Sequence, residues 1–126
     1  MVAACLIAAT VLAQAVAPKA EPFPLGRVKL LDGPFARANQ ATAKYLLTVN
    51  PDRLLHSFRK HIGLEPKAPM YGGWENMGLA GHSLGHYLSA CAMEYAASGD
   101  AKFKEKVDYI ISEFVACQKS RPDGYL

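Results

Sequence analysis

The chain has 126 residues, a length that one domain can account for. Half of it (51%) is hydrophobic and 20% is charged, which is typical of a globular rather than a disordered protein. The net charge of +3 is small and no run of Lys and Arg occurs, so nothing in the charge pattern indicates a nucleic-acid partner.

The first 17 residues form an uncharged segment rich in Ala, Val and Leu. Residues 13–15 and 15–17 both match the small-x-small pattern of a signal peptidase site, and we expect cleavage after Ala15 because Pro18 disfavours a cut just before it. The segment is shorter than the roughly 20 apolar residues that span a bilayer. No Lys or Arg precedes it, which indicates an upstream start or an atypical signal. We predict a signal peptide, with a buried helix as the alternative, and therefore an exported protein without a membrane anchor after cleavage.

Three cysteines occur, at positions 5, 91 and 117. An odd and sparse set does not indicate a disulfide framework, and no CxxC or Cys/His cluster indicates a zinc site. Cys91 and Cys117 both fall on apolar helix faces, which favours inert core thiols over nucleophiles.

The N-terminal part of the mature chain carries several turn and helix signals. Residues 18–24 hold three prolines and predict an extended linker. Residues 27–30 alternate polar and apolar side chains and predict a short strand. The turn at residues 32–34 opens a predicted helix over residues 35–49, with Asp32 or Gly33 at its cap and Pro34 in its first turn.

A second helix is expected to begin at Asn50 and Pro51 and to end at Gly63 in a left-handed conformation. Residues 64–73 carry two prolines and two glycines and predict a loop.

The predicted helix over residues 79–98 has one charged residue, Glu94, near its end. One face is apolar and holds Leu84, Leu88, Cys91 and Tyr95. The opposite side holds Gly78, His82, His86, Ser89 and Met93. A helix without a charged face has no side suited to bulk water, so we expect it to be buried all round or to line a cavity with one side.

Residues 101–119, after the break at Gly99 and Asp100, form an amphipathic pattern. Its apolar stripe consists of Phe103, Val107, Ile110, Phe114 and Cys117, which predicts a surface helix with one buried face. The glutamates at positions 65, 94, 105 and 113 are most simply surface charges. The chain ends in a turn over residues 121–126.

These elements predict an all-α fold of roughly four helices, because no strand–helix–strand alternation occurs. A buried helix followed by an amphipathic one is what an α/α toroid of inner and outer helices requires. An ordinary helical bundle requires the same pair, so the pattern alone leaves both open.

Two histidines, His82 and His86, are spaced i and i+4 and project from one helix face. This spacing can hold a metal, as in HExxH helices, but no glutamate stands at the base position and two histidines fall short of the three protein ligands of a catalytic zinc. Lining a sugar cleft and packing as core histidines are the alternatives, and we favour the cleft.

Four further residues lie in loops where a sugar can bind. Trp74 can stack on a sugar ring or anchor the loop in the core, and Glu75 can hydrogen-bond sugar hydroxyls. Nothing is clearly paired with Glu75 as the second group that a glycosidase needs. Asp123 and Tyr125 lie in the final turn, where an Asp-Gly pair more often serves the backbone. No Gly-x-Ser-x-Gly, P-loop or dinucleotide motif is present.

Several motifs resemble the β-L-arabinofuranosidases of glycoside hydrolase families 127 and 146, which are bacterial enzymes once known as a domain of unknown function. The resemblance covers residues 24–126. Its motifs are PLGRVKLLDGPF (24–35), NPDRLL (50–55), YGGWE (71–75), GLAGHSLGHYLSA (78–90), and CQ (117–118) followed by DGYL (123–126).

The resemblance implies an (α/α)6 toroid followed by β-sandwich domains, and release of L-arabinofuranose from the non-reducing ends of plant glycans or glycopeptides. It also implies a cysteine nucleophile in a zinc site formed with other cysteines and a glutamate, and a further glutamate as acid/base. All of these are expected downstream of residue 126, so no residue of this chain is assigned to catalysis or to the metal.

The chain then corresponds to the first helices of the toroid, truncated, and we expect it to be inactive alone. The resemblance places His82 and His86 on an early inner helix facing the sugar pocket, and Trp74, Glu75 and the turn with Asp123 and Tyr125 at its rim. These six residues are the predicted substrate-binding set. The alternative is a freestanding helical carbohydrate-binding or interaction protein without catalysis.

Overall fold

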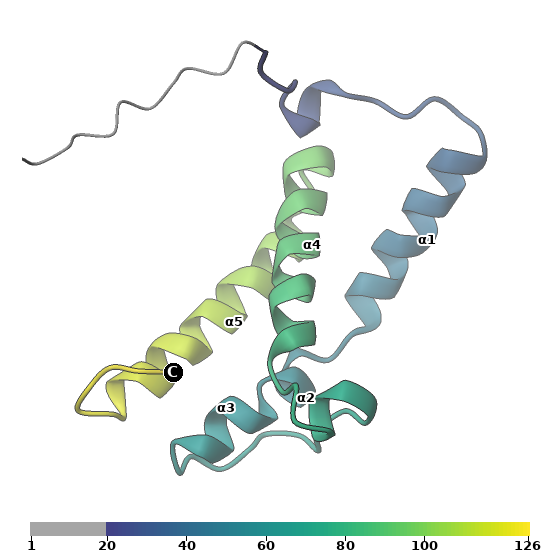
Figure 1. The fold of residues 1–126 in the computed structure, drawn as a ribbon. Helices are drawn as coiled ribbons and strands as arrows, with labels where there is room; N and C mark the ends of the chain where they lie inside the picture. The colour runs from purple at the N-terminus through teal and green to yellow at the C-terminus, as the bar shows by residue number, and fades with distance from the viewer. Residues whose placement is uncertain (1–19) are drawn as a thin grey trace, which may run out of the picture.

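A computed structural model describes residues 20–126, which contain five α-helices, two short 3₁₀ turns and no strand (Figure 1). The predicted signal peptide, residues 1–17, and the start of the predicted linker lie outside the described residues. The longer helices are α1 (Pro34–Thr48), α4 (His82–Ser98) and α5 (Ala101–Lys119). The shorter elements are η1 (Leu25–Arg27), α2 (Pro51–Leu54), α3 (His56–His61) and η2 (Gly73–Asn76). This all-helical architecture is consistent with part of an α/α toroid.

The capping residues act where the sequence predicts them. Gly33 caps α1 and Pro34 is its first residue. At α2 the Asn50 side chain accepts a hydrogen bond from the backbone N–H of Asp52 at 2.9 Å, with Pro51 as the first helical residue. These side chains satisfy or remove backbone donors that a helix N-terminus leaves unpaired.

Three details of the predicted elements are wrong. The expected strand at residues 27–30 does not form; residues 25–27 make a 3₁₀ turn, and the described chain provides no neighbouring strand to pair with. The helix after Asn50 is interrupted at the fully buried Leu55, so it forms α2 and α3 separately. Helix α4 begins three residues later than predicted, because Gly78 (φ 95°) and Gly81 (φ 93°) adopt left-handed conformations that end any earlier helical turn.

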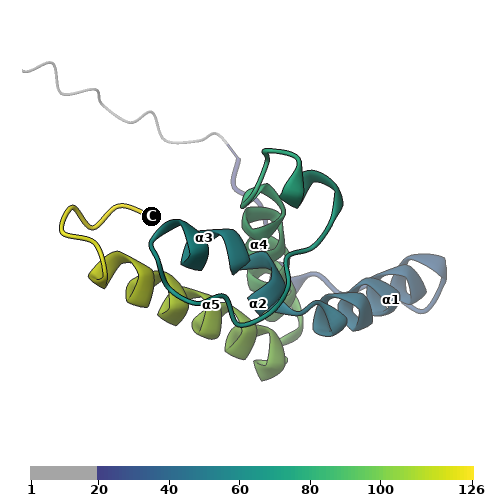
Figure 2. The same ribbon diagram turned by 90° about the horizontal axis from the view of Figure 1, so that it is seen from below.

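Helix α4 lies at the centre of the arrangement, with α5 on one side and α1 on the other, while α2 and α3 close one end (Figures 1 and 2). Its buried side chains are Leu84, Tyr87 and Cys91. The Tyr87 hydroxyl donates a hydrogen bond to the backbone carbonyl of Leu46 on α1 at 3.0 Å, and burial raises the pKa of this phenol. The core therefore combines apolar contacts with one buried hydrogen bond between α4 and α1.

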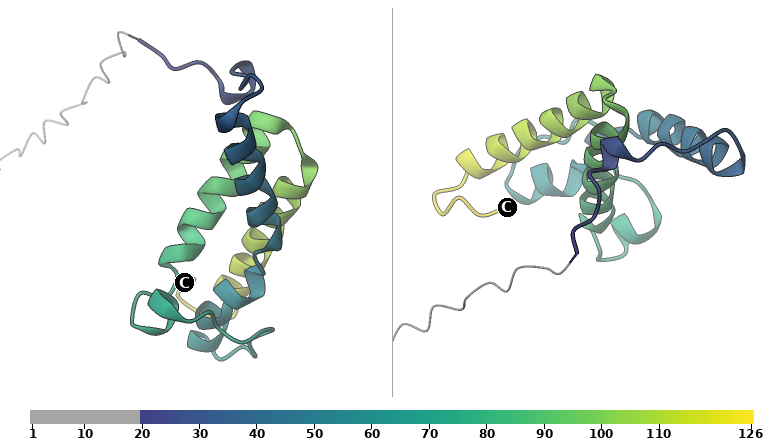
Figure 3. Two further views of the ribbon diagram at one scale, coloured as in Figure 1. Left: turned by 90° about the vertical axis from the view of Figure 1, so that its right-hand side faces the viewer. Right: turned by 90° about the horizontal axis from the view of Figure 1, so that it is seen from above.

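The side of α4 that faces away from this core is only partly covered. His82, His86 and Ser89 are exposed, and Met93 is 55% exposed. The views from the side and from above show α1 and α5 diverging from α4 rather than enclosing it (Figure 3). Of the residues predicted on this side, His86 lines the cavity described below, whereas His82, Ser89 and Met93 are exposed outside its lining. Tyr95, predicted on the apolar face, is 39% exposed at the end of α4.

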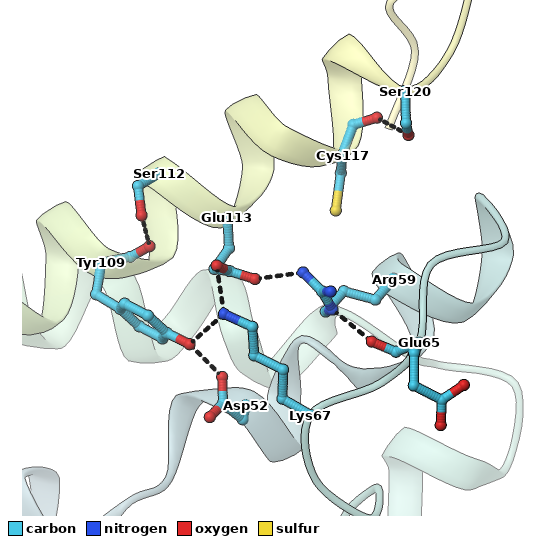
Figure 4. A network of polar contacts seen from close by, with 9 residues as sticks. All are labelled: Asp52, Arg59, Glu65, Lys67, Tyr109, Ser112, Glu113, Cys117 and Ser120. Atoms are coloured by element: carbon cyan, nitrogen blue, oxygen red, sulfur yellow. Dashed lines mark hydrogen bonds and ion pairs between the residues drawn. The ribbon is translucent and has the colours of Figure 1, made fainter.

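Helix α5 carries a buried charge cluster, and the prediction of Glu113 as a surface charge is wrong (Figure 4). Glu113 as a whole is 8% exposed, and its carboxylate accepts hydrogen bonds from Arg59 at 2.6 Å and from Lys67 at 2.7 Å. Lys67 also donates to the Tyr109 hydroxyl, which donates to Asp52. Burial alone would raise the pKa of Glu113, but the two cations outweigh it and hold the pKa below its ordinary value.

This cluster joins α5 to α3 and to the loop that follows α3. Glu113 lies three residues after Ile110 and four before Cys117, both fully buried, so its position on the helix faces the core. The helical spacing of Glu113 from these two residues indicates burial, although a charged side chain by itself indicates a surface position.

No described helix is long and apolar enough to cross a membrane.

Candidate functional site

A cavity of about 490 Å³ opens between α1, the 71–75 segment and the first turns of α4. Its volume lies within the range of small-molecule pockets. Tyr71 belongs to the part of the lining that comes from the 71–75 segment, and Ser83, His86 and Ala90 belong to the part that comes from α4. The full lining is Tyr45, Leu46, Thr48, Val49, Leu54, Tyr71, Gly72, Glu75, Ser83, His86, Tyr87 and Ala90.

Glu75 is one of the residues that line this cavity, and it holds the start of α4 in place. It is 4% exposed, and its carboxylate accepts hydrogen bonds from the backbone N–H groups of Gly81 at 3.0 Å and Ser83 at 3.1 Å. A carboxylate at a helix N-terminus is stabilised by the unpaired N–H groups and the helix dipole. Burial would raise the pKa of Glu75, but these hydrogen bonds outweigh it and the pKa lies below its ordinary value. Glu75 is therefore an ionised acceptor that positions α4.

Gly81 is required for this geometry. Its φ of 93° is one that side chains rarely adopt, and an added Cβ would lie 2.7 Å from the Phe58 ring. The close approach to α3 holds the chain so that the N–H groups of Gly81 and Ser83 both point at Glu75.

His82, His86 and Trp74 form an aromatic cluster at the same end of α4. The two Nε2 atoms of the histidines are 3.1 Å apart, and their ring centroids are 4.6 Å apart. The Trp74 ring centroid lies 5.7 Å from that of His82, and Trp74 is 61% exposed. Of these three residues, His86 lines the cavity. The structure therefore brings four of the six predicted substrate-binding residues together.

The other two, Asp123 and Tyr125, do not line this cavity. Asp123 accepts two hydrogen bonds from Arg121, both at 2.9 Å, and one from the backbone N–H of Tyr125 at 3.1 Å. These bonds hold the pKa of Asp123 down at about 2. In this structure Asp123 shapes the turn beyond α5.

Three tyrosines of the cavity were not among the predicted site residues. Tyr71 accepts a hydrogen bond from the backbone N–H of Asn50 at 3.1 Å, and the Arg53 guanidinium lies 3.8 Å from its ring centroid. Tyr45 is 66% exposed, whereas Tyr87 is buried. Tyr71 begins the YGGWE motif, so its closeness in sequence to Trp74 and Glu75 could have indicated that it belongs to the same site. Tyr45 and Tyr87 fit the apolar periodicity of their helices, which gave no sign of a cavity.

Cys91 and Cys117 are free, fully buried thiols, and burial raises the pKa of each, as expected for core cysteines. Within residues 20–126 no group of three or more His, Cys, Asp or Glu side chains is arranged to hold a metal ion.

The cavity combines aromatic rings with residues that can donate and accept hydrogen bonds, namely Ser83, Tyr45 and His86. Rings and hydroxyl partners of this kind suit a polyhydroxylated ligand, whose C–H face packs on an aromatic ring. Glu75 is the one carboxylate in the lining, and hydrolysis of a glycoside requires a pair of catalytic groups. The cavity has the features of a binding surface.

Residues 27–126 match the sequence profile of the family described as β-L-arabinofuranosidase, GH127 catalytic domain. No curated protein matches the chain. The profile match spans most of the chain and includes every element from α1 to α5. With its all-helical architecture and the cavity at the start of α4, the chain belongs to the glycoside hydrolase family 127 β-L-arabinofuranosidase catalytic domain family.

Proposed function

We propose that these residues form one wall of the sugar pocket of an exported bacterial enzyme that releases L-arabinofuranose from the non-reducing ends of β-L-arabinofuranosides in plant glycans. Membership of the GH127 family supports the reaction class. The observation that carries the binding role is the cavity in which His86, Ser83 and three tyrosines meet.

In this proposal His86 hydrogen-bonds a sugar hydroxyl, since its imidazole lines the cavity and its ring is exposed. Trp74 supplies an exposed aromatic face next to His82 on which a sugar ring or the next residue of the glycan can stack. Glu75 helps to position His86 relative to Trp74, because it is the residue next to Trp74 and its carboxylate holds the first turn of α4.

We propose that the reacting groups are not among residues 20–126. Glu75 is already held as an ionised acceptor by two backbone N–H groups, so it is poorly suited to donate a proton. Burial of Cys91 and Cys117, with raised pKa values, makes both poor nucleophiles. We therefore expect the isolated chain to be catalytically inactive, and we expect the zinc that the family resemblance implies to be bound by residues other than 20–126.

The proposal is tested with 4-nitrophenyl β-L-arabinofuranoside and its α-L anomer. We expect the complete gene product to hydrolyse the β anomer far faster than the α anomer, and the 126-residue chain to hydrolyse neither. Sequencing the DNA past the codon for Leu126 checks that the reading frame continues. Turnover by the isolated chain, or preference of the complete product for the α anomer, would contradict the proposal.

A further inference from the structure

The imidazoles of His82 and His86 meet at the solvent-exposed start of α4. Their Nε2 atoms are 3.1 Å apart, and one ring donates a hydrogen bond to the other across this gap. Two nitrogens that each lie about 2.0–2.1 Å from one ion are about 2.9 Å apart at a right angle and about 3.3 Å apart at the tetrahedral angle. The separation of 3.1 Å falls between these two values. One ion can therefore contact both nitrogens from a position to one side of the line that joins them, once the ring that donates the hydrogen bond has turned its nitrogen toward the ion.

We propose that His82 and His86 together bind one divalent transition-metal ion of the Cu²⁺, Ni²⁺ and Zn²⁺ group, with water or a sugar hydroxyl in the remaining coordination positions. The ion replaces the hydrogen bond between the rings, and the Nε2 proton of the donor ring moves to Nδ1 or to solvent. This inference goes beyond the sugar-binding role and does not depend on it.

The helix holds the pair in place before an ion arrives. Residues four apart lie on one face of a helix, and His82 is the first residue of α4 while His86 is in its second turn. Both rings are exposed, so an ion reaches them without rearrangement of the core. Apart from the turn of one imidazole, little ordering is needed on binding, which favours affinity.

A helix N-terminus is a poor place for a cation because the backbone dipole is positive there. Glu75 offsets this effect, since its buried, ionised carboxylate accepts hydrogen bonds from Gly81 and Ser83, the neighbours of His82. The first turn of α4 therefore carries a compensating negative charge next to the two imidazoles.

The donor atoms define the kind of ion. Neutral imidazoles suit Cu²⁺, Ni²⁺ and Zn²⁺, whereas Mg²⁺ and Ca²⁺ prefer oxygen ligands. The order of stability for nitrogen ligands predicts tightest binding for Cu²⁺, with Ni²⁺ and Zn²⁺ weaker and Mn²⁺ weaker still.

The test uses Trp74, the one tryptophan of the sequence, whose ring lies 5.7 Å from that of His82. Ni²⁺ is titrated into the tag-free chain while tryptophan fluorescence is recorded, in a Cys5→Ser background that removes a soft ligand outside the described residues. We expect saturable quenching, an affinity for Ni²⁺ at least tenfold lower in His82→Ala and in His86→Ala, and no change in His61→Ala, which removes another exposed histidine.

A thermal scan provides a second measurement on the same variants. An ion that links His82 to His86 stabilises the first turns of α4, so Ni²⁺ should raise the Tm of the parent chain and leave that of His86→Ala unchanged. Equal Ni²⁺ affinity in the parent and in the His82→Ala/His86→Ala double variant would overturn the proposal, as would equal binding of Mg²⁺ or Ca²⁺. Loss of arabinofuranoside hydrolysis in the complete gene product bears only on the sugar-binding role.

Discussion

Replacing Glu75 by alanine tests whether this buried carboxylate positions the first turn of α4, which lies beside the cavity. The substitution leaves the backbone N–H groups of Gly81 and Ser83 without their acceptor. A hydrogen bond to a charged group contributes about 1.5–3 kcal/mol, and loss of a helix cap costs about 1 kcal/mol. Gly81 and Ser83 are only partly buried, so water replaces some of what is lost, and we expect a net destabilisation of about 2–3 kcal/mol.

The assay is thermal unfolding followed by circular dichroism at 222 nm. For a domain of this size each 1 kcal/mol lowers the Tm by roughly 4–8 °C, so Glu75→Ala should lower it by about 10–20 °C. Glu105→Gln, an exposed glutamate on α5, is the matched control and should change stability by less than about 0.5 kcal/mol. A Tm for Glu75→Ala within about 2 °C of the parent chain would refute the assignment.

The pH dependence gives an independent check on Glu75. Its pKa is lowered in the folded state, so the unfolded chain binds the proton more tightly. The contribution of Glu75 is therefore complete above the unfolded pKa of about 4.3 and is lost as the pH falls through the lower folded value. Glu75→Gln should flatten the acid limb of the stability curve, and an unchanged limb would show that the carboxylate gains nothing on folding.

Three further changes test other parts of the structure. Glu113→Gln should destabilise the chain by about 2 kcal/mol at pH 7, which is less than for a fully enclosed ion pair because Lys67 remains partly exposed. The difference in unfolding free energy between the parent and Glu113→Gln should shrink below about pH 4.3, and urea unfolding at several pH values measures it. Gly81→Ala should cost about 1–3 kcal/mol, because φ is 93° and the new Cβ meets Phe58; a Tm equal to that of the parent would contradict this. Cys91 should react with Ellman's reagent only after unfolding, so rapid labelling of the native chain would contradict its burial.

Local chemistry made much of the fold predictable. Caps such as Asn50, the turn at Gly99 and the 3–4 spacing of α5 determine backbone geometry over a few residues, and the structure confirms them. The break at Leu55 was missed because it depends on packing in the core rather than on a helix-breaking residue. The burial of Glu113 was missed because its partners, Arg59 and Lys67, lie about fifty residues away in sequence.

The candidate site was predictable only in part. His82 and His86 share a helix face by spacing alone, so their proximity followed from the sequence. The role of Glu75 as the acceptor for the start of α4 depends on the path of the chain between η2 and α4, and no sequence motif in this segment predicts that path. The separation of Asp123 and Tyr125 from the cavity depends in the same way on the path of the chain beyond α5.

Whether the cavity at the start of α4 binds the sugar is measured by kcat/KM of the complete gene product for 4-nitrophenyl β-L-arabinofuranoside in three forms: the parent, His86→Ala and His61→Ala. We predict that His86→Ala lowers kcat/KM about tenfold or more, as expected for loss of a hydrogen bond to the substrate, without lowering the Tm, while His61→Ala matches the parent. Equal kcat/KM values in all three would show that the cavity at the start of α4 does not bind the sugar.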